Sequence, residues 1–106
     1  MIPLEDFKKL ELKIAEIETV APHPNADRLY VLGVRVGDIQ KTVVAGIREH
    51  YSEEELKGKK VVIVNNLEPA VIRGVESQGM LLAASDAGAL TLVVPERLIA
   101  SGAQVR

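Results

Sequence analysis

Two short, unbroken apolar runs in the second half of the chain constrain its fold more than any other feature. Residues 61–64 are Val-Val-Ile-Val, and residues 80–84 are Met-Leu-Leu-Ala-Ala. Runs of this length and composition are typical of buried strands. The connection between them, residues 65–79, carries a single cation, Arg73. Long connections without regular structure of their own are uncommon in compact domains, so we expect a functional loop here, with a plain surface crossing as the alternative.

An alternating pattern nearer the N-terminus predicts a long first strand. From Leu10 onward, Leu10, Leu12 and Ile14 alternate with charged residues, and the pattern then slips by one position at Ala15, so that the next large apolar residue is Ile17. A slip of one residue in a pattern of period two is what a β-bulge produces, and bulges bend strands around the corners of barrels. We therefore expect this strand to be shared between two sides of a small barrel.

The following segment predicts a hairpin and then a short helix. Residues 29–36 and 40–45 form the second and third strands around a turn. Ser52 and Glu55 have the spacing of a capping box, which predicts that a helix begins there, and Gly58 ends it.

Three strands, a short helix and two further strands give the element order of an all-β, five-stranded Greek-key barrel of the OB type. Such barrels bind ligands on strands two and three and in the loops that follow strands one and four, which are residues 21–28 and 65–79 in this chain. An SH3-like barrel is the competing fold, although it does not usually carry a helix between its third and fourth strands.

Composition and missing motifs argue against catalysis. The chain has no cysteine, which excludes disulfides, zinc–thiolate sites and thiol nucleophiles. It contains no phosphate-loop, dinucleotide-binding or nucleophile-elbow motif, and neither His23 nor His50 has the neighbours of a metal site. We expect a non-catalytic protein without cofactor or metal. No apolar run approaches the roughly 18 residues of a membrane span and no signal peptide is seen, so we expect a cytoplasmic protein with no membrane partner.

The charge balance does not favour bulk binding of nucleic acid. The formal net charge is −2, and the aromatic residues are one phenylalanine and two tyrosines, which are few for stacking on single strands. Arg35 and Lys41 alternate outward on the second and third strands, where they form either a binding platform or a solvated face. His23 lies in the first loop, as a hydrogen-bonded residue or a phosphate contact.

Motifs along nearly the whole chain add a resemblance to a known family. They are Asp-Phe-x-Lys-Leu-Glu-Leu-Lys-Ile at 6–14, His-Pro-Asn-Ala-Asp-Arg-Leu-Tyr at 23–30, Val-Val-Ala-Gly-Ile at 43–47, Asn-Leu-x-Pro at 66–69 and Arg-Gly-Val-x-Ser-x-Gly-Met-Leu-Leu-Ala at 73–83. Together they resemble the tRNA-binding domain appended to methionyl-tRNA synthetases, which also occurs as a free-standing tRNA-binding protein and in cytokine-like synthetase cofactors. The chain is similar to the dimeric C-terminal domain, or separate β subunit, of a prokaryotic methionyl-tRNA synthetase.

The resemblance implies one OB-fold domain over residues 1–106 that binds the outside of folded tRNA as a homodimer and raises the tRNA affinity of a synthetase catalytic chain. It implies a dimer interface in the extension at residues 86–106. The implied tRNA contacts are Asn66, Arg73, Ser77 and Met80, assisted by the barrel residues Arg28, Arg35, Lys41 and His23. The implied interface residues are Leu98, Ile99 and Val105.

Other readings remain open. Many relatives carry lysine or arginine where this chain has Glu68, Ala70 and Val71 or Ile72, which weakens phosphate contacts. Asn66 and Ser77 have the alternative of capping backbone groups of the loop, and Met80 has that of a core residue.

For the whole chain, the alternatives are a dimeric docking or chaperone-like peptide-binding module, favoured by the acidic charge and the apolar tail, and a binder of single-stranded oligonucleotides.

Overall fold

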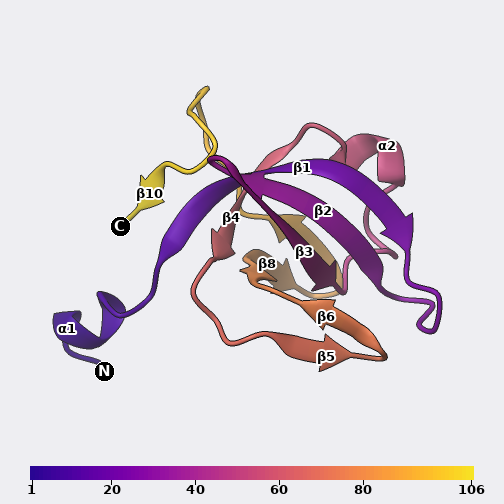
Figure 1. Cartoon of the computed structure of the whole chain (residues 1–106), viewed down its shortest axis with the longest axis horizontal. Coiled ribbons are helices and arrows are strands. Elements are labelled where there is room, and N and C mark those ends of the chain that lie inside the picture. The colour runs from indigo at the N-terminus through magenta and orange to yellow at the C-terminus, as the bar shows by residue number, and fades with distance from the viewer.

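Strands dominate the computed structural model, which describes residues 1–106 (Figure 1). The elements in chain order are α1 (Leu4–Phe7), β1 (Leu12–Pro22), β2 (Tyr30–Val36), β3 (Ile39–Ala45), α2 (Glu53–Leu56), β4 (Lys60–Val64), β5 (Ala70–Ile72), β6 (Val75–Ser77), β7 (Met80–Leu81), β8 (Ala83–Asp86), β9 (Ala89–Leu92) and β10 (Gln104–Val105). The predicted all-β class is confirmed, and so is the helix between the third and fourth strands. The strand count differs from the prediction, because the second half of the chain is divided into shorter strands. Neither helix has the length and apolar character needed to cross a membrane.

The central sheet has the strand order β3-β2-β1-β4-β7, and β10 pairs with β1. In Figure 1, β1, β2 and β3 arch over the molecule while β5 and β6 lie on the opposite side. β1 is the shared strand that the sequence predicts. Its first part, Leu12 to Glu16, pairs with β4, and its second part, from Glu16 to Pro22, pairs with β2.

The bulge in β1 lies farther along the strand than the sequence predicts. The register against β2 shifts between Ile17 and Thr19, whereas the alternation slips at Ala15. The slip in the apolar pattern at Ala15 is therefore not caused by the bulge. Successive residues of a strand face opposite sides of the sheet. Ile14 faces a small outer cluster, while Ala15 and Ile17 belong to the main core, so both faces of β1 are covered where the pattern changes.

Two apolar clusters hold the fold together. The main core fills the barrel and includes the fully buried Ile17, Leu32 and Ile63. The outer cluster lies on the other face of β1 and β4. Its buried members are Leu12, Ile14, Val62 and Val64, and Phe7, Leu82, Ala103 and Val105 pack against them.

Segment 77–79 closes the barrel against the free edge of β3. The backbone N–H of Gln78 donates to the carbonyl oxygen of Thr42 over 2.8 Å. Side chains complete the closure, because the N–H of Thr42 donates to the Gln78 Oε1 atom (2.8 Å) and the N–H of Val44 donates to the Ser77 hydroxyl (3.0 Å). The backbone groups at the edge of β3 thus find hydrogen-bond partners in the end of β6 and in Gln78, which follows it.

The helix α2 begins as the capping box predicts. The Ser52 hydroxyl accepts the N–H of Glu55, and the Glu55 carboxylate accepts the N–H of Ser52. The bond from the Ser52 backbone, followed by that from its hydroxyl, lowers the pKa of Glu55 below its ordinary value.

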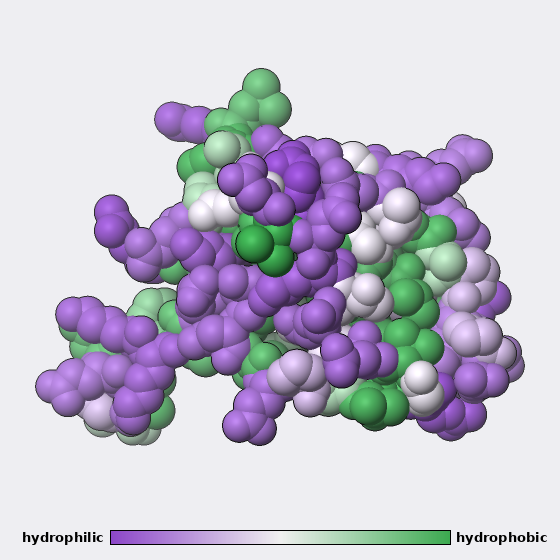
Figure 2. Space-filling view, in the orientation of Figure 1, coloured by the Kyte–Doolittle hydropathy of each residue, from purple (hydrophilic) through white to green (hydrophobic).

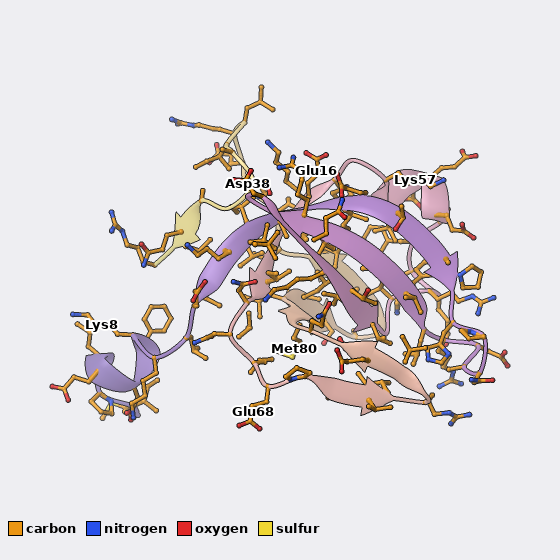
Figure 3. All side chains as sticks on the ribbon, in the orientation of Figure 1. Lys8, Glu16, Asp38, Lys57, Glu68 and Met80 are labelled. Carbon is orange, nitrogen blue, oxygen red and sulfur yellow. The ribbon has the colours of Figure 1, made fainter.

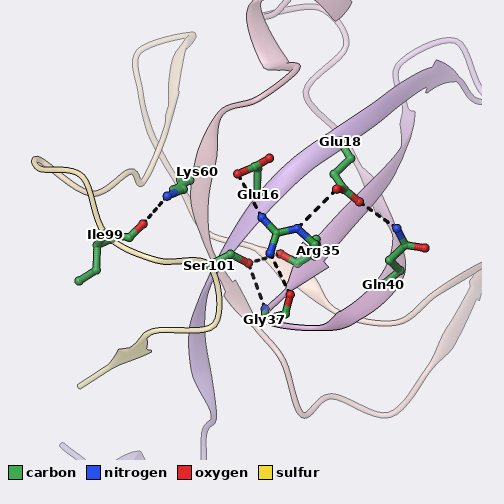
Figure 4. A network of polar contacts seen from close by, with 8 residues as sticks. All are labelled: Glu16, Glu18, Arg35, Gly37, Gln40, Lys60, Ile99 and Ser101. Carbon is green, nitrogen blue, oxygen red and sulfur yellow. Dashed lines mark hydrogen bonds and ion pairs between the residues drawn. The ribbon is translucent and has the colours of Figure 1, made fainter.

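The C-terminal tail returns across the barrel and docks on its own chain. The Ser101 hydroxyl accepts the N–H of Gly37 (3.0 Å) and donates to the carbonyl oxygen of Arg35 (2.6 Å), as Figure 4 shows. Gly102 has a φ of +90°, and a Cβ there would lie 2.9 Å from the Gly37 Cα, so this crossing requires glycine. The turn before it remains uncovered, since Leu98 is 98% exposed.

Candidate nucleic-acid interface

The connection between β4 and β7 contains a hairpin rather than the irregular loop that the sequence predicts. β5 and β6 pair directly, and Arg73 and Gly74 form the two-residue turn between them. Their φ angles are +52° and +92°, which are the values of a type I′ turn. The hairpin therefore presents Arg73 at its tip, in a left-handed conformation that non-glycine residues rarely adopt.

A buried histidine ties this hairpin to the loop after β1. His23 is 4% exposed, and its Nδ1 atom accepts the backbone N–H of Asn25 over 2.9 Å. The proton of the neutral ring therefore sits on Nε2, which donates to the carbonyl oxygen of Ile72 at 2.9 Å. His23 thus holds the two predicted binding loops together.

Asn25 and Arg73 complete this junction, which we call the two-loop clasp (His23, Asn25, Ile72 and Arg73). The Arg73 Nη2 atom donates to the carbonyl oxygen of Asn25 at 3.0 Å, and the Asn25 side-chain amide donates to the carbonyl oxygen of Arg73 at 3.4 Å. A hollow lined by residues 25–29 and Arg73 lies beside it. The clasp and the hollow beside it bring together His23, Arg28 and Arg73 among the predicted site residues.

Two of the predicted contacts use their polar atoms within the protein. Ser77 is 4% exposed, and its hydroxyl donates to the carbonyl oxygen of Gly79 while accepting the N–H of Val44. The Asn66 amide oxygen accepts the N–H of Glu11 (2.7 Å), and its NH₂ group donates to the carbonyl oxygen of Lys9 (2.8 Å). The structure gives both residues positioning roles, and a direct contact of either with RNA stays a prediction.

The predicted barrel cations are not gathered in one place. Arg28 is highly exposed, with its Nε 2.9 Å from the Glu49 carboxylate. Lys41 donates to the carbonyl oxygen of Asn65 over 2.8 Å.

Arg35 lies at the opposite end of β2 from the clasp. Its guanidinium lies 3.4 Å from a Glu16 oxygen and 3.5 Å from a Glu18 oxygen and donates to the carbonyl oxygen of Gly37 (Figure 4). The charge of Arg35, which was predicted to lie on an exposed face, is therefore neutralised by two carboxylates of the neighbouring strand β1.

Met80 is neither a core residue nor fully exposed. It pairs with Val64 at the start of β7 and is 49% exposed. In Figure 3 it lies within the arc formed by the β4–β5 link and the β5–β6 hairpin, while Glu68 points outward from that link. In Figure 2 apolar residues form a band to the right of this position, rising from β5. Met80 is thus accessible beside the hairpin.

Sequence reasoning missed Arg48 and Asn25. Arg48 lies in the link from β3 to α2, where its Nη1 atom donates to the carbonyl oxygen of Ala26 at 3.4 Å and its N–H donates to that of Arg28 at 3.4 Å. No local pattern distinguishes it from a solvated arginine. No group of three or more histidine or carboxylate side chains is arranged to hold a metal ion.

Comparison with known proteins gives this arrangement its context. Residues 12–104 match the family model described as "Putative tRNA binding domain". The chain is 50% identical over 105 residues to a methionine–tRNA ligase of Pyrococcus horikoshii, a match that covers 99% of this chain and 14% of that protein. The chain therefore spans a small part of the length of the curated relatives it matches.

Solved structures agree with this relationship. The crystal structure of a MetRS-related protein from Pyrococcus horikoshii has a TM-score of 0.93 and 33% identity, covering 100% of this chain and 98% of that one. The chaperone CsaA of Bacillus anthracis has a TM-score of 0.90 and 27% identity, covering 100% and 99%. The first of these structures confirms the OB-like fold.

Proposed function

Because this chain belongs to the tRNA-binding domain family and is similar to a segment of methionine–tRNA ligases, we propose that it binds folded tRNA without catalysing a reaction and raises the tRNA affinity of a methionyl-tRNA synthetase. The two-loop clasp is the observation that carries the proposal. It holds Arg73 at an exposed hairpin tip beside the exposed Arg28, so that two cations face solvent from a rigid support.

Recognition in this proposal depends on phosphate, ribose and shape rather than on stacking. Arg28 and Arg73 would contact phosphates, whose oxygens suit the planar guanidinium. Met80, exposed beside the hairpin, would pack against a sugar or base. Asn66 and Ser77 would shape the segment that presents these residues. The surface of folded RNA offers 2′-hydroxyls and phosphates for contacts of this kind.

We further propose that the chain acts as a homodimer in the cytoplasm. Leu98 is 98% and Ile99 46% exposed, and Val93 and Val94 are also exposed nearby in the tail. Exposed apolar side chains in one region are typical of protein interfaces. Two copies would present two clasps to one tRNA. The resulting gain in effective concentration would offset the affinity lost because cations are missing around Glu68.

A titration tests the proposal. The protein is titrated with total tRNA and with a single-stranded pyrimidine oligonucleotide at two salt concentrations, and static light scattering gives its mass in the same buffer. We expect a dimer that binds tRNA in preference to the oligonucleotide and more weakly at high salt. Absence of tRNA binding at low salt would contradict the proposal.

The second candidate is binding of unfolded peptides by the same barrel. It is favoured by the structural similarity to the chaperone CsaA and by the exposed apolar side chains of the tail. Binding of a fluorescent apolar peptide, with no competition from tRNA and no tRNA binding, would favour this candidate over the first.

A further inference from the structure

Three arginines from separate segments converge on one turn of the chain, residues 25–28. Arg73, at the tip of the β5–β6 hairpin, donates to the carbonyl oxygen of Asn25. Arg48, from the link between β3 and α2, donates to the next carbonyl oxygen, that of Ala26. Arg28 belongs to the turn itself, and its own carbonyl oxygen accepts the N–H of Arg48. We call the turn 25–28 together with Arg48 and Arg73 the three-arginine turn.

The protein neutralises this positive charge only in part. The two backbone carbonyls each accept one guanidinium N–H, while an arginine carries five such donors. The carboxylate of Glu49, from the link between β3 and α2, lies 2.9 Å from the Nε of Arg28, and Asp27 is the acid within the turn. Several donors therefore remain for an external anion.

The Arg28–Glu49 pair is open to solvent and can be displaced. The side chain of Arg28 is 84% exposed and that of Glu49 is 58% exposed. Exposed pairs of this kind are weak, because water screens them and both side chains lose freedom. A phosphate group that bridges several guanidinium groups forms charge-assisted, often bidentate hydrogen bonds, which are stronger.

We propose that the three-arginine turn is a phosphate-binding site and that Glu49 occupies the place of the phosphate in the free protein. This inference rests on the proposed function and deepens it, since it assigns Arg48 as a third phosphate contact and Glu49 as an internal competitor. The ligand is a phosphodiester of the RNA backbone. Displacing Glu49 from Arg28 is then part of binding.

The test compares matched substitutions. Affinity for tRNA is measured at two salt concentrations for the unchanged protein, Glu49→Gln and Arg48→Gln. Glu5→Gln and Lys8→Gln serve as controls, because they remove the same charges at exposed positions in and next to α1, which lies on the opposite side of the molecule from the loop after β1 (Figure 1). We expect Glu49→Gln to tighten binding about two- to fivefold, the range that loss of an exposed ion pair allows. Arg48→Gln should weaken binding about tenfold and lower the salt slope by about 0.7–0.9.

A second readout separates this site from the proposed function. Sodium triphosphate is added to ¹⁵N-labelled protein, and the arginine Nε–H signals are followed by NMR. We expect shifts at Arg28, Arg48 and Arg73 that occur at lower triphosphate concentration in Glu49→Gln. Normal tRNA binding by all four variants, without these shifts, would overturn the site and leave the proposed function standing. Shifts without any tRNA binding would support the phosphate site and contradict the proposed function.

Discussion

The Nε2 atom of His23 lies 2.9 Å from the carbonyl oxygen of Ile72, 49 residues farther along the chain. This bond joins the loop after β1 to the β5–β6 hairpin, and it is possible only because Nδ1 of the same ring accepts the N–H of Asn25 and leaves the proton on Nε2. This buried side chain, together with the bonds between Asn25 and Arg73, therefore fixes how the two loops face each other. The position of Arg73 depends on this arrangement.

Replacing His23 with alanine should loosen the clasp without unfolding the barrel. The N–H of Asn25 and the carbonyl oxygen of Ile72 would lose their partners, which costs about 1–3 kcal/mol when such groups stay buried. We expect a lower free energy of unfolding in urea and faster amide exchange at Asn25. His50→Ala is the control, because that histidine is exposed. Equal stability of the two variants would contradict a structural role for His23.

Arg73→Asn tests the guanidinium without disturbing the turn. Asparagine tolerates the left-handed conformation that Arg73 adopts, so the hairpin should persist. We expect tRNA binding to become less favourable by about 1.5–3 kcal/mol, the range for a charge-assisted hydrogen bond. Fluorescence titration measures the affinity, and thermal unfolding confirms the fold. An unchanged dissociation constant at fixed salt would remove Arg73 from the interface.

Ser77→Ala should weaken the closure of the barrel. The buried N–H of Val44 would lose its acceptor, at a cost of about 1–3 kcal/mol in the free energy of unfolding. Ser85→Ala, at an exposed position of β8, should change stability by no more than about 0.5 kcal/mol. Chemical denaturation compares the two variants. If Ser77 served only to contact tRNA, its replacement would leave stability unchanged.

The capping box of α2 predicts a pH dependence. The Ser52 backbone N–H and then its hydroxyl lower the pKa of Glu55 in the folded protein. Glu55 therefore contributes stability above its unfolded pKa and loses that contribution as pH falls through the lower folded pKa. Ser52→Ala should move the NMR titration midpoint of the Glu55 carboxylate upward. In Glu55→Gln this part of the acid dependence of stability should disappear, and its persistence would assign it to another group.

Leu98→Lys tests the proposed dimer. A charged side chain on the exposed turn of the tail would oppose burial against a second copy, so the scattering mass should fall to that of a single chain. Val71→Lys adds the same charge to an exposed residue of the hairpin and should leave the mass unchanged. Folding of both variants is checked by circular dichroism. A dimer that survives Leu98→Lys would place the interface elsewhere.

Local chemistry in the sequence determined much of this protein. The apolar run at 61–64 predicted the buried strand β4, the Ser52–Glu55 spacing predicted α2, and the combined motifs predicted the family. The prediction of a second buried strand at 80–84 was wrong, because this run is divided between β7 and β8 and its residues are exposed or half-buried. The correctly predicted features depend on residues that are neighbours along the chain, so they can be identified without knowing the fold.

The tertiary structure decided what lies against each of these elements. The β5–β6 hairpin escaped prediction because its strands are short and its turn is Arg-Gly rather than the usual Asn-Gly or Asp-Gly. The closing role of Ser77 and the approach of Arg48 to Ala26 likewise have no local signal. Their hydrogen-bond partners come from distant segments that only the folded barrel brings together. Periodicity indicates which face of a strand is apolar, but the packing of the whole chain selects the groups that satisfy its polar atoms.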